Sequence, residues 1–127
     1  MPRHPRARLV EPDAPPRSRE LRLVDAEAAD PRVLTDAALL TAAARGAVAA
    51  GSGHVMDEAL VRFPNGAVTL VLVLAESHLS IHTWPEERRI AIDLFSCGAI
   101  DGPRVLEVLR TGLALRDVSL RSIGRGG

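Results

Sequence analysis

The sequence contains no lysine, so every basic side chain apart from histidine is an arginine. Enzymes that use pyridoxal phosphate hold this cofactor as a Schiff base on a lysine, which excludes this chemistry here. Attachment of biotin or a lipoyl group needs a lysine as well. If the protein uses an electron-accepting carbonyl, that carbonyl must come from another source.

Other absences narrow the class of protein further. No apolar run approaches the ~20 residues that span a bilayer, and the first residues lack the pattern of a signal peptide. A single cysteine, Cys97, excludes an internal disulfide and fits a reducing compartment. The net charge is zero and the arginines are scattered. We expect a cytoplasmic protein with neither a membrane nor a nucleic acid as partner.

The length of 127 residues predicts one domain, preceded by a tail. Residues 1–18 hold five of the nine prolines together with many arginines, and such sequence has too little apolar surface to offset its ordering entropy. We therefore expect a disordered tail over residues 1–18 and a single folded domain over residues 19–127.

The apolar pattern predicts two helices and five or six strands. Asp30-Pro31 is typical of a helix start, and apolar residues recur at helical spacing until Gly51. The second helix is expected over Asp101–Leu113, and Pro64-Asn65-Gly66 is typical of a hairpin turn. Strands are expected over Glu20–Asp25, Val55–Phe63, Ala67–Ala75, from His78 onward, over Ile90–Phe95 and over Arg116–Ile123.

This order predicts an α+β fold, a two-layer sandwich of a mainly antiparallel sheet with two helices on one face. Ala67–Ala75 is apolar almost throughout, which indicates a strand that is covered on both faces. Two helices cover only one face of a sheet. We therefore expect a second copy of the sheet to cover the other face, which gives an isologous αββα homodimer.

The segment richest in chemical groups is AESHLSIHTWPE, from Ala75 to Glu86. In a strand, His78, Ser80 and His82 would share one face. One interpretation is structural, with a hydrogen-bonded core histidine at 82 and a strand-end hydroxyl at Ser77. The absence of a G-x-S-x-G pattern argues against a serine hydrolase.

A metal site is a further interpretation of the same segment. Its ligands would come from His78, His82, Cys97, Glu76 and Glu86, which are acceptable for zinc. In a strand, however, the two imidazoles lie ~13 Å apart along the chain, too far for one ion. We therefore expect no metal.

The segment AESHLSIHTWPE, followed by DLFSCG with Cys97 twenty positions after Ser77, closely resembles the short bacterial and archaeal S-adenosylmethionine decarboxylase proenzymes. The stretch FPNGAVT, from Phe63 to Thr69, resembles the lead-in to the processing strand of that family. The resemblance covers about Asp30 to the C-terminus and is strong from Phe63 to Gly98.

The resemblance implies that the chain cuts itself between Glu76 and Ser77. The Ser77 hydroxyl attacks the preceding carbonyl to give an ester, and elimination then leaves a dehydroalanine that becomes a pyruvoyl group. The products are a β chain, residues 1–76, and an α chain, residues 77–127. The pyruvoyl carbonyl, made from the backbone, would form a Schiff base with the substrate amine without pyridoxal phosphate or metal.

The resemblance also implies roles for single residues. His82 matches the processing histidine, and Thr69 stands where the family usually has a serine hydroxyl that assists the ester step. Cys97 matches the catalytic proton donor. Glu86 matches a carboxylate of the substrate pocket, and Phe63 matches an aromatic side chain that could stack on adenine.

The expected function is decarboxylation of S-adenosylmethionine, which gives the aminopropyl donor for spermidine and other polyamines. Two departures from the family motivate alternatives: Leu23-Val24-Asp25-Ala26 replaces a Leu-Tyr-Gly-Cys-like stretch, and Glu87-Arg88-Arg89 follows the Trp-Pro-Glu. The first alternative is a pyruvoyl-dependent arginine or ornithine decarboxylase. The second is a non-catalytic dimeric partner that binds an active subunit or a small metabolite.

Overall fold

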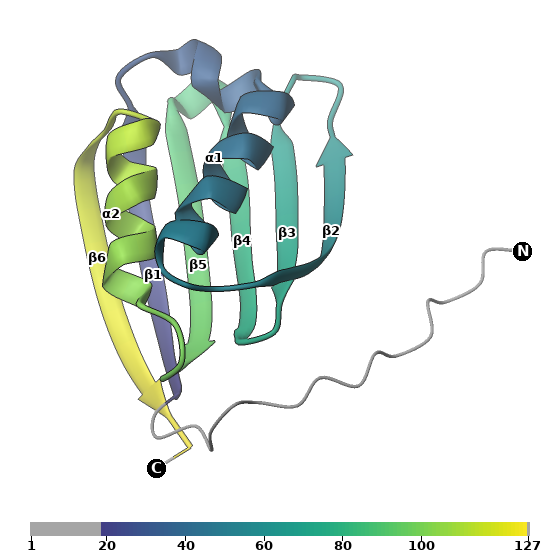
Figure 1. Cartoon of the computed structure of the whole chain (residues 1–127). Coiled ribbons are helices and arrows are strands. Elements are labelled where there is room, and N and C mark those ends of the chain that lie inside the picture. The colour runs from purple at the N-terminus through teal and green to yellow at the C-terminus, as the bar shows by residue number, and fades with distance from the viewer. Residues whose placement is uncertain (1–18, 127) are drawn as a thin grey trace, which may run out of the picture.

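The computed structural model describes residues 19–126, so the tail expected over residues 1–18 lies outside the described part. Within it, a six-stranded sheet has the strand order β2-β3-β4-β5-β1-β6, and all neighbours are antiparallel (Figure 1). The strands are β1 (Arg19–Ala28), β2 (Val55–Arg62), β3 (Val68–Leu74), β4 (Ser77–Trp84), β5 (Arg89–Cys97) and β6 (Leu115–Arg125). All the strands expected from the sequence are therefore present.

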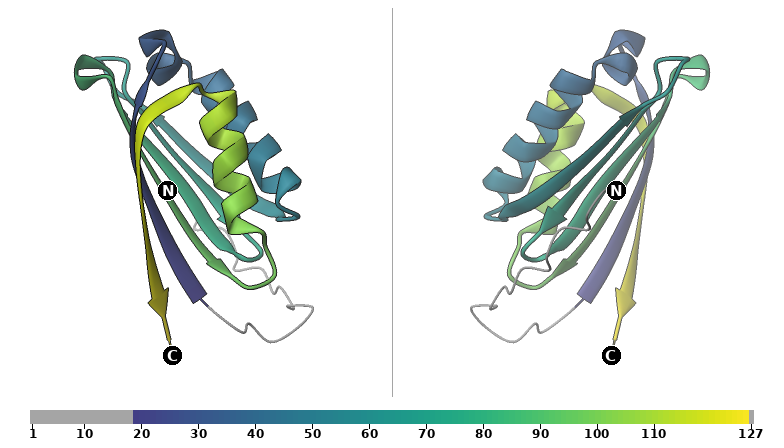
Figure 2. Two further views of the ribbon diagram at one scale, coloured as in Figure 1. Left: turned by 90° about the vertical axis from the view of Figure 1, so that its left-hand side faces the viewer. Right: turned by 90° about the vertical axis from the view of Figure 1, so that its right-hand side faces the viewer.

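Helices α1 (Ala37–Ala50) and α2 (Gly102–Gly112) pack on the same face of this sheet, and the side views show no helix on the other face (Figure 2). The predicted α+β two-layer architecture of the chain is confirmed. Neither helix is long and apolar enough to cross a membrane, and the same holds for every helix in residues 19–126.

The first α-helix begins later than predicted, so the expected start at Asp30-Pro31 is wrong. Asp30 instead caps a 3-10 turn over Pro31–Thr35, where its side chain accepts the N–H of Arg32. Asp36 then leaves helical geometry, with φ −96° and ψ 86°, and its carboxylate accepts the N–H of Leu39. Because Asp36 supplies a second N-cap, the α-helix starts at Ala37. The predicted end at Gly51 is confirmed.

The neighbouring strands β1 and β6 are longer than the sequence pattern indicated. They pair with each other from Arg19↔Arg125 to Ala28↔Leu115, with a register shift between Asp25 and Glu27. The ladder of hydrogen bonds with a neighbouring strand extends each strand beyond its alternating apolar segment.

The core lies between the helices and the sheet. Alternate residues of the strands point toward the helices, as in β3, where Val68, Leu70 and Leu72 are buried. Burial of each large aliphatic side chain stabilises the fold by about 1.5–3 kcal/mol. The largest fully buried side chains are Leu34, Leu40, Val48, Leu70, Leu72, Leu79, Ile81, Ile90, Ile92, Leu94, Leu109 and Leu113.

A buried hydroxyl fixes the 3-10 turn to one end of the sheet. The Oγ1 of Thr83 in β4 donates to the carbonyl of Leu34 at 2.8 Å and accepts the N–H of Val68 at 2.8 Å. Both hydrogen bonds are buried, so the loss of this hydroxyl would leave the two backbone groups unpaired. Thr83 thus holds the start of β3 and the end of β4 in place.

Candidate active site

The predicted site residues and their neighbours form two groups at opposite ends of strand β4. The Ser77 end contains His54, Glu76, Ser77, Ser96 and Cys97, and the His82 end contains Phe63, Asn65, Thr69, His82, Trp84 and Glu86. Ser77 and His82 are five positions apart along β4, which corresponds to ~16 Å at the rise of a strand.

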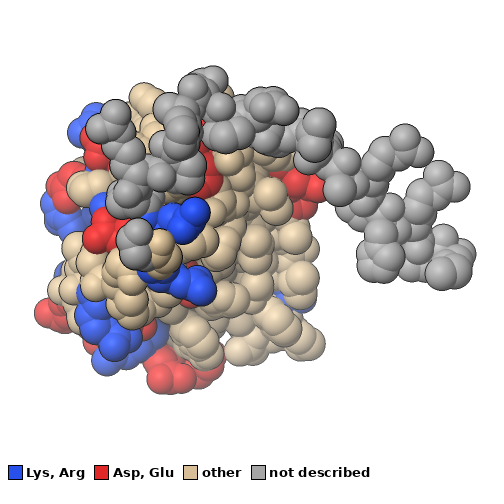
Figure 3. Space-filling view, turned by 90° about the horizontal axis from the view of Figure 1, so that it is seen from below, with Lys and Arg blue, Asp and Glu red and all other residues tan. Residues whose placement is uncertain are grey.

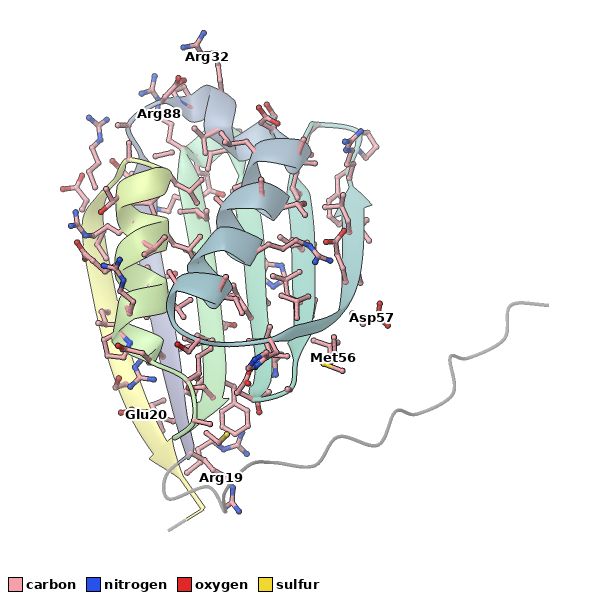
Figure 4. The ribbon with its side chains drawn as sticks, in the orientation of Figure 1. Arg19, Glu20, Arg32, Met56, Asp57 and Arg88 are labelled. Atoms are coloured by element: carbon pink, nitrogen blue, oxygen red, sulfur yellow. The ribbon has the colours of Figure 1, made fainter. Side chains whose placement is uncertain are left out.

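The labelled side chains locate the two ends in Figure 4. Arg19, the register partner of Cys97, marks the Ser77 end, at the bottom of the view. Arg88 and Arg32 mark the opposite end, beside which β4 finishes at Trp84. The single sequence motif is therefore spread over the full length of one strand.

The Ser77 end contains a strained backbone. Leu74 pairs with Ser77, so Ala75 and Glu76 form a two-residue hairpin turn. Such turns usually take glycine or asparagine, and this one has neither. The positive φ falls instead on Ser77, at 144°, which residues with a side chain rarely adopt. A residue held in such a region stores about 1–3 kcal/mol, here directly after the predicted cleavage bond.

The carbonyl group of the predicted cleavage bond has a backbone donor. The N–H of Cys97, at the end of β5, donates to the carbonyl oxygen of Glu76 at 3.2 Å. Register pairing of Ser77 with Ser96 brings the two strands together at this point. The structure thus unites Glu76, Ser77 and Cys97, which lie as far as 21 positions apart in the chain.

The carboxylate of Glu76 is buried and paired. Only 8% of Glu76 is exposed, and its two oxygens accept the backbone N–H of His54 at 3.0 Å and the ring Nδ1 of His54 at 2.9 Å. The sequence analysis missed His54, because it lies 22 positions before its partner and outside the motif.

The His82 end contains a paired hydroxyl and imidazole. Thr69 and His82 are register partners on β3 and β4, and the Oγ1 of Thr69 lies 3.2 Å from the Nδ1 of His82. Both side chains lie on the face of the sheet that carries no helix. The ring centroids of Trp84 and His82 lie 6.3 Å apart.

A groove of about 550 Å³ opens beside this pair, a volume within the range of about 300–1,000 Å³ for small-molecule sites. The amide of Asn65 donates to the Oε2 of Glu86 at 3.1 Å, which holds that carboxylate beside the groove. The lining residues are Phe63, Pro64, Asn65, Ala67, Thr69, His82, Thr83 and Trp84. The two predicted substrate-binding residues, Phe63 and Glu86, therefore lie at the same end as Thr69 and His82.

The donor set proposed for a metal is dispersed in the structure. His78 packs against the ring of Phe95 at a centroid distance of 5.9 Å, while His82 pairs with Thr69. Within residues 19–126, no three His, Cys, Asp or Glu side chains gather closely enough to hold a metal ion.

Comparisons with known proteins give a consistent result. The curated S-adenosylmethionine decarboxylase proenzyme of Symbiobacterium thermophilum is 48% identical over 73 residues, which cover 57% of this chain and 55% of the relative. The proenzyme of Pyrobaculum arsenaticum is 41% identical over 76 residues, covering 59% and 61%. The chain thus spans little more than half the length of these curated relatives.

The fold has a solved counterpart. The crystal structure of the adenosylmethionine decarboxylase from Aquifex aeolicus matches with a TM-score of 0.79 and 26% identity, over 87% of this chain and 92% of that one. Residues 21–126 also match the family model described as S-adenosylmethionine decarboxylase. Because this match spans nearly all the described residues, the chain belongs to the S-adenosylmethionine decarboxylase family.

Proposed function

We propose that this protein is a self-processing, pyruvoyl-dependent decarboxylase of S-adenosylmethionine that provides aminopropyl groups for polyamine synthesis. The observation that carries the proposal is the Glu76–Ser77 bond, which lies in a strained turn with its carbonyl held by the N–H of Cys97. Family membership and the names of the relatives support the same reaction. They do not favour the arginine or ornithine alternative.

The first step is attack by the Ser77 hydroxyl oxygen on the carbonyl carbon of Glu76. The C–N bond breaks, the nitrogen of Ser77 takes up a proton, and an ester joins the two residues. Negative charge develops on the carbonyl oxygen of Glu76, where the N–H of Cys97 already donates. Loss of the amide also frees Ser77 from its positive φ, so part of the backbone strain is released in this step.

The second step needs a base at the α-carbon of Ser77. Removal of this proton breaks the bond between Cβ and the ester oxygen, which releases the main-chain carboxylate of residue 76 as the new C-terminus and leaves a dehydroalanine. Water then converts the dehydroalanine to a pyruvoyl group and ammonia. The products would be residues 1–76 and 77–127. His82 is the proposed base, with Thr69 fixing its Nδ1. Within one chain, however, His82 lies ~16 Å from Ser77 along β4, beyond the reach of a proton transfer.

A second copy of the chain resolves this separation. The face without helices exposes large apolar side chains, among them Val73 at 47% and Trp84 at 42%. Seen from below, charged side chains gather on the β6 side of the molecule (Figure 3). Face-to-face packing about a two-fold axis across the strands would set the Ser77 end of one chain against the His82 end of the other. We therefore propose an αββα homodimer with two composite sites.

The composite site also accounts for substrate binding. Phe63 offers a half-exposed ring for stacking on adenine, and Glu86 offers a carboxylate for ribose hydroxyls or a cationic group. The pyruvoyl carbonyl at residue 77 supplies the electron sink for loss of carboxylate. The thiol of Cys97, which is partly exposed beside Ser77, returns a proton to the substrate.

Intact-mass measurement of purified protein tests the proposal. We expect two fragments that meet at Ser77, with an α chain whose first residue lacks an amine, and release of CO2 from S-adenosylmethionine labelled in its carboxylate. A single uncut chain would exclude self-processing and favour the non-catalytic partner. Cut protein that releases CO2 from arginine or ornithine and not from S-adenosylmethionine would overturn the substrate assignment.

A further inference from the structure

We infer that His54 is a positioning residue for self-cleavage, which holds Glu76 so that the strained turn presents its carbonyl to Ser77. The inference rests on the proposed function and adds a residue that lies outside the family motif in the sequence.

His54 makes three contacts with the two turn residues. Its carbonyl accepts the N–H of Ala75 at 2.9 Å, its N–H donates to the Oε1 of Glu76 at 3.0 Å, and its Nδ1 lies 2.9 Å from the Oε2 of Glu76. A buried carboxylate is costly unless it is paired. The Glu76 carboxylate is therefore most stable where both of its oxygens contact His54.

Gly53 allows this close approach. A Cβ on Gly53 would lie 2.5 Å from a methyl of Ile100, 2.8 Å from one of Val48 and 3.3 Å from the Oε1 of Glu76. The same loop is anchored to the start of α2, because the N–H of Asp101 donates to the carbonyl of Gly51 at 2.9 Å. His54 is thus presented from a segment fixed by both helices.

Residue 76 is consequently held on two sides. His54 fixes its side chain, and the N–H of Cys97 fixes its carbonyl. With residue 76 held in this way, the chain enters β4 with a positive φ at Ser77. Release of the side chain would let the turn relax, which lowers the backbone strain and turns the carbonyl away from the donor of Cys97.

The test follows cleavage of newly made full-length chain in cell-free synthesis, sampled over time by intact mass. We expect His54→Ala to slow cleavage about tenfold, which corresponds to about 1.4 kcal/mol of barrier. His54→Asn places an amide N–H near the position of Nδ1 and should restore a rate close to wild type. If His54 acted only through the general stability of the fold, this one donor would not restore the cleavage rate.

The matched control is Arg45→Ala. This change removes a partly exposed ion pair, Arg45 Nε to Glu58 Oε1 at 2.9 Å, which joins α1 to β2 without touching the turn. We expect cleavage at the wild-type rate. His54→Ala that cuts as fast as Arg45→Ala would overturn the inference.

A second variant covers the case in which His54→Ala does not fold. Glu76→Gln weakens the same contact from its other side and leaves His54 in place. It should also slow cleavage about tenfold, and a wild-type rate would overturn the inference. Cleavage of the wild-type chain distinguishes failure of the His54 inference from failure of the proposed function. If wild type is cut, only His54 is at issue, and if it stays whole, both proposals fall.

Discussion

The division of the site between two ends of β4 leads to a complementation experiment. Ser77→Ala removes the attacking hydroxyl, and His82→Ala removes the proposed base. Proton transfer needs atoms within about 3 Å, whereas His82 lies ~16 Å from Ser77 of its own chain. Each variant expressed alone should remain uncut, because every site then lacks either the hydroxyl or the base. A dimer with one chain of each kind should contain one complete site, in which Ser77 of the His82→Ala chain meets His82 of the Ser77→Ala chain.

The expected yield follows from pairing statistics. When the two variants are co-expressed in equal amounts, about half of the His82→Ala chains have a Ser77→Ala partner. We expect about half of the His82→Ala chains to be cut and none of the Ser77→Ala chains. Intact mass separates the fragments, because the α chain released from the His82→Ala variant carries its own substitution.

A matched control removes the complementing residue from the partner. Co-expression of His82→Ala with a Ser77→Ala, His82→Ala double variant offers the same dimer but no histidine at residue 82, so no chain should be cut. If the first mixture also stays whole while wild type is cut, the composite site is refuted. Cleavage of His82→Ala alone would refute its assignment as the base.

Three further predictions concern single residues. Cys97→Ala keeps the backbone N–H that holds the carbonyl of Glu76, so intact mass should show cleavage while CO2 release from S-adenosylmethionine falls at least tenfold; full activity would contradict a role for the thiol. Thr83→Val leaves the Leu34 carbonyl and the Val68 N–H unpaired and should lower the free energy of unfolding by about 1–3 kcal/mol in urea denaturation. An unchanged midpoint would contradict this. Glu86→Gln should raise KM more than it lowers kcat in steady-state assays, and the reverse pattern would place Glu86 in the chemistry.

Much of the fold was predictable because local signals agreed with the final structure. The apolar run through β3 indicated a strand, and Pro64-Asn65-Gly66 indicated the hairpin that the structure shows between β2 and β3. The cover expected on the second face of β3 is not part of the single chain, in which Val73 is 47% exposed. The start of α1 was not predictable from a single capping signal. Asp30 and Asp36 both cap, and only the non-helical backbone at Asp36 determines where the α-helix begins.

The chemical groups of the site were predictable from their motif, but their contacts were not. The pairing of Thr69 with His82 and of Cys97 with Glu76 depends on strand register, which no single segment specifies. The contact of His54 with Glu76 joins a loop after α1 to a turn 22 positions later. Propensity and spacing carry no information about such a contact.

The motif is compact in sequence, but strand geometry spreads it out in space. Residues five positions apart would lie near one another on a helix, where the rise is about 1.5 Å per residue. On β4 the rise is more than twice as large, so Ser77 begins the eight-residue strand and His82 lies near its other end. Ser77 and His82 can then act together only if a second copy packs on the helix-free face with its β4 running in the opposite direction. In that arrangement, His82 of one chain would lie opposite Ser77 of the other. The same property that separates the two residues within a chain would thus make the dimer a requirement for self-cleavage.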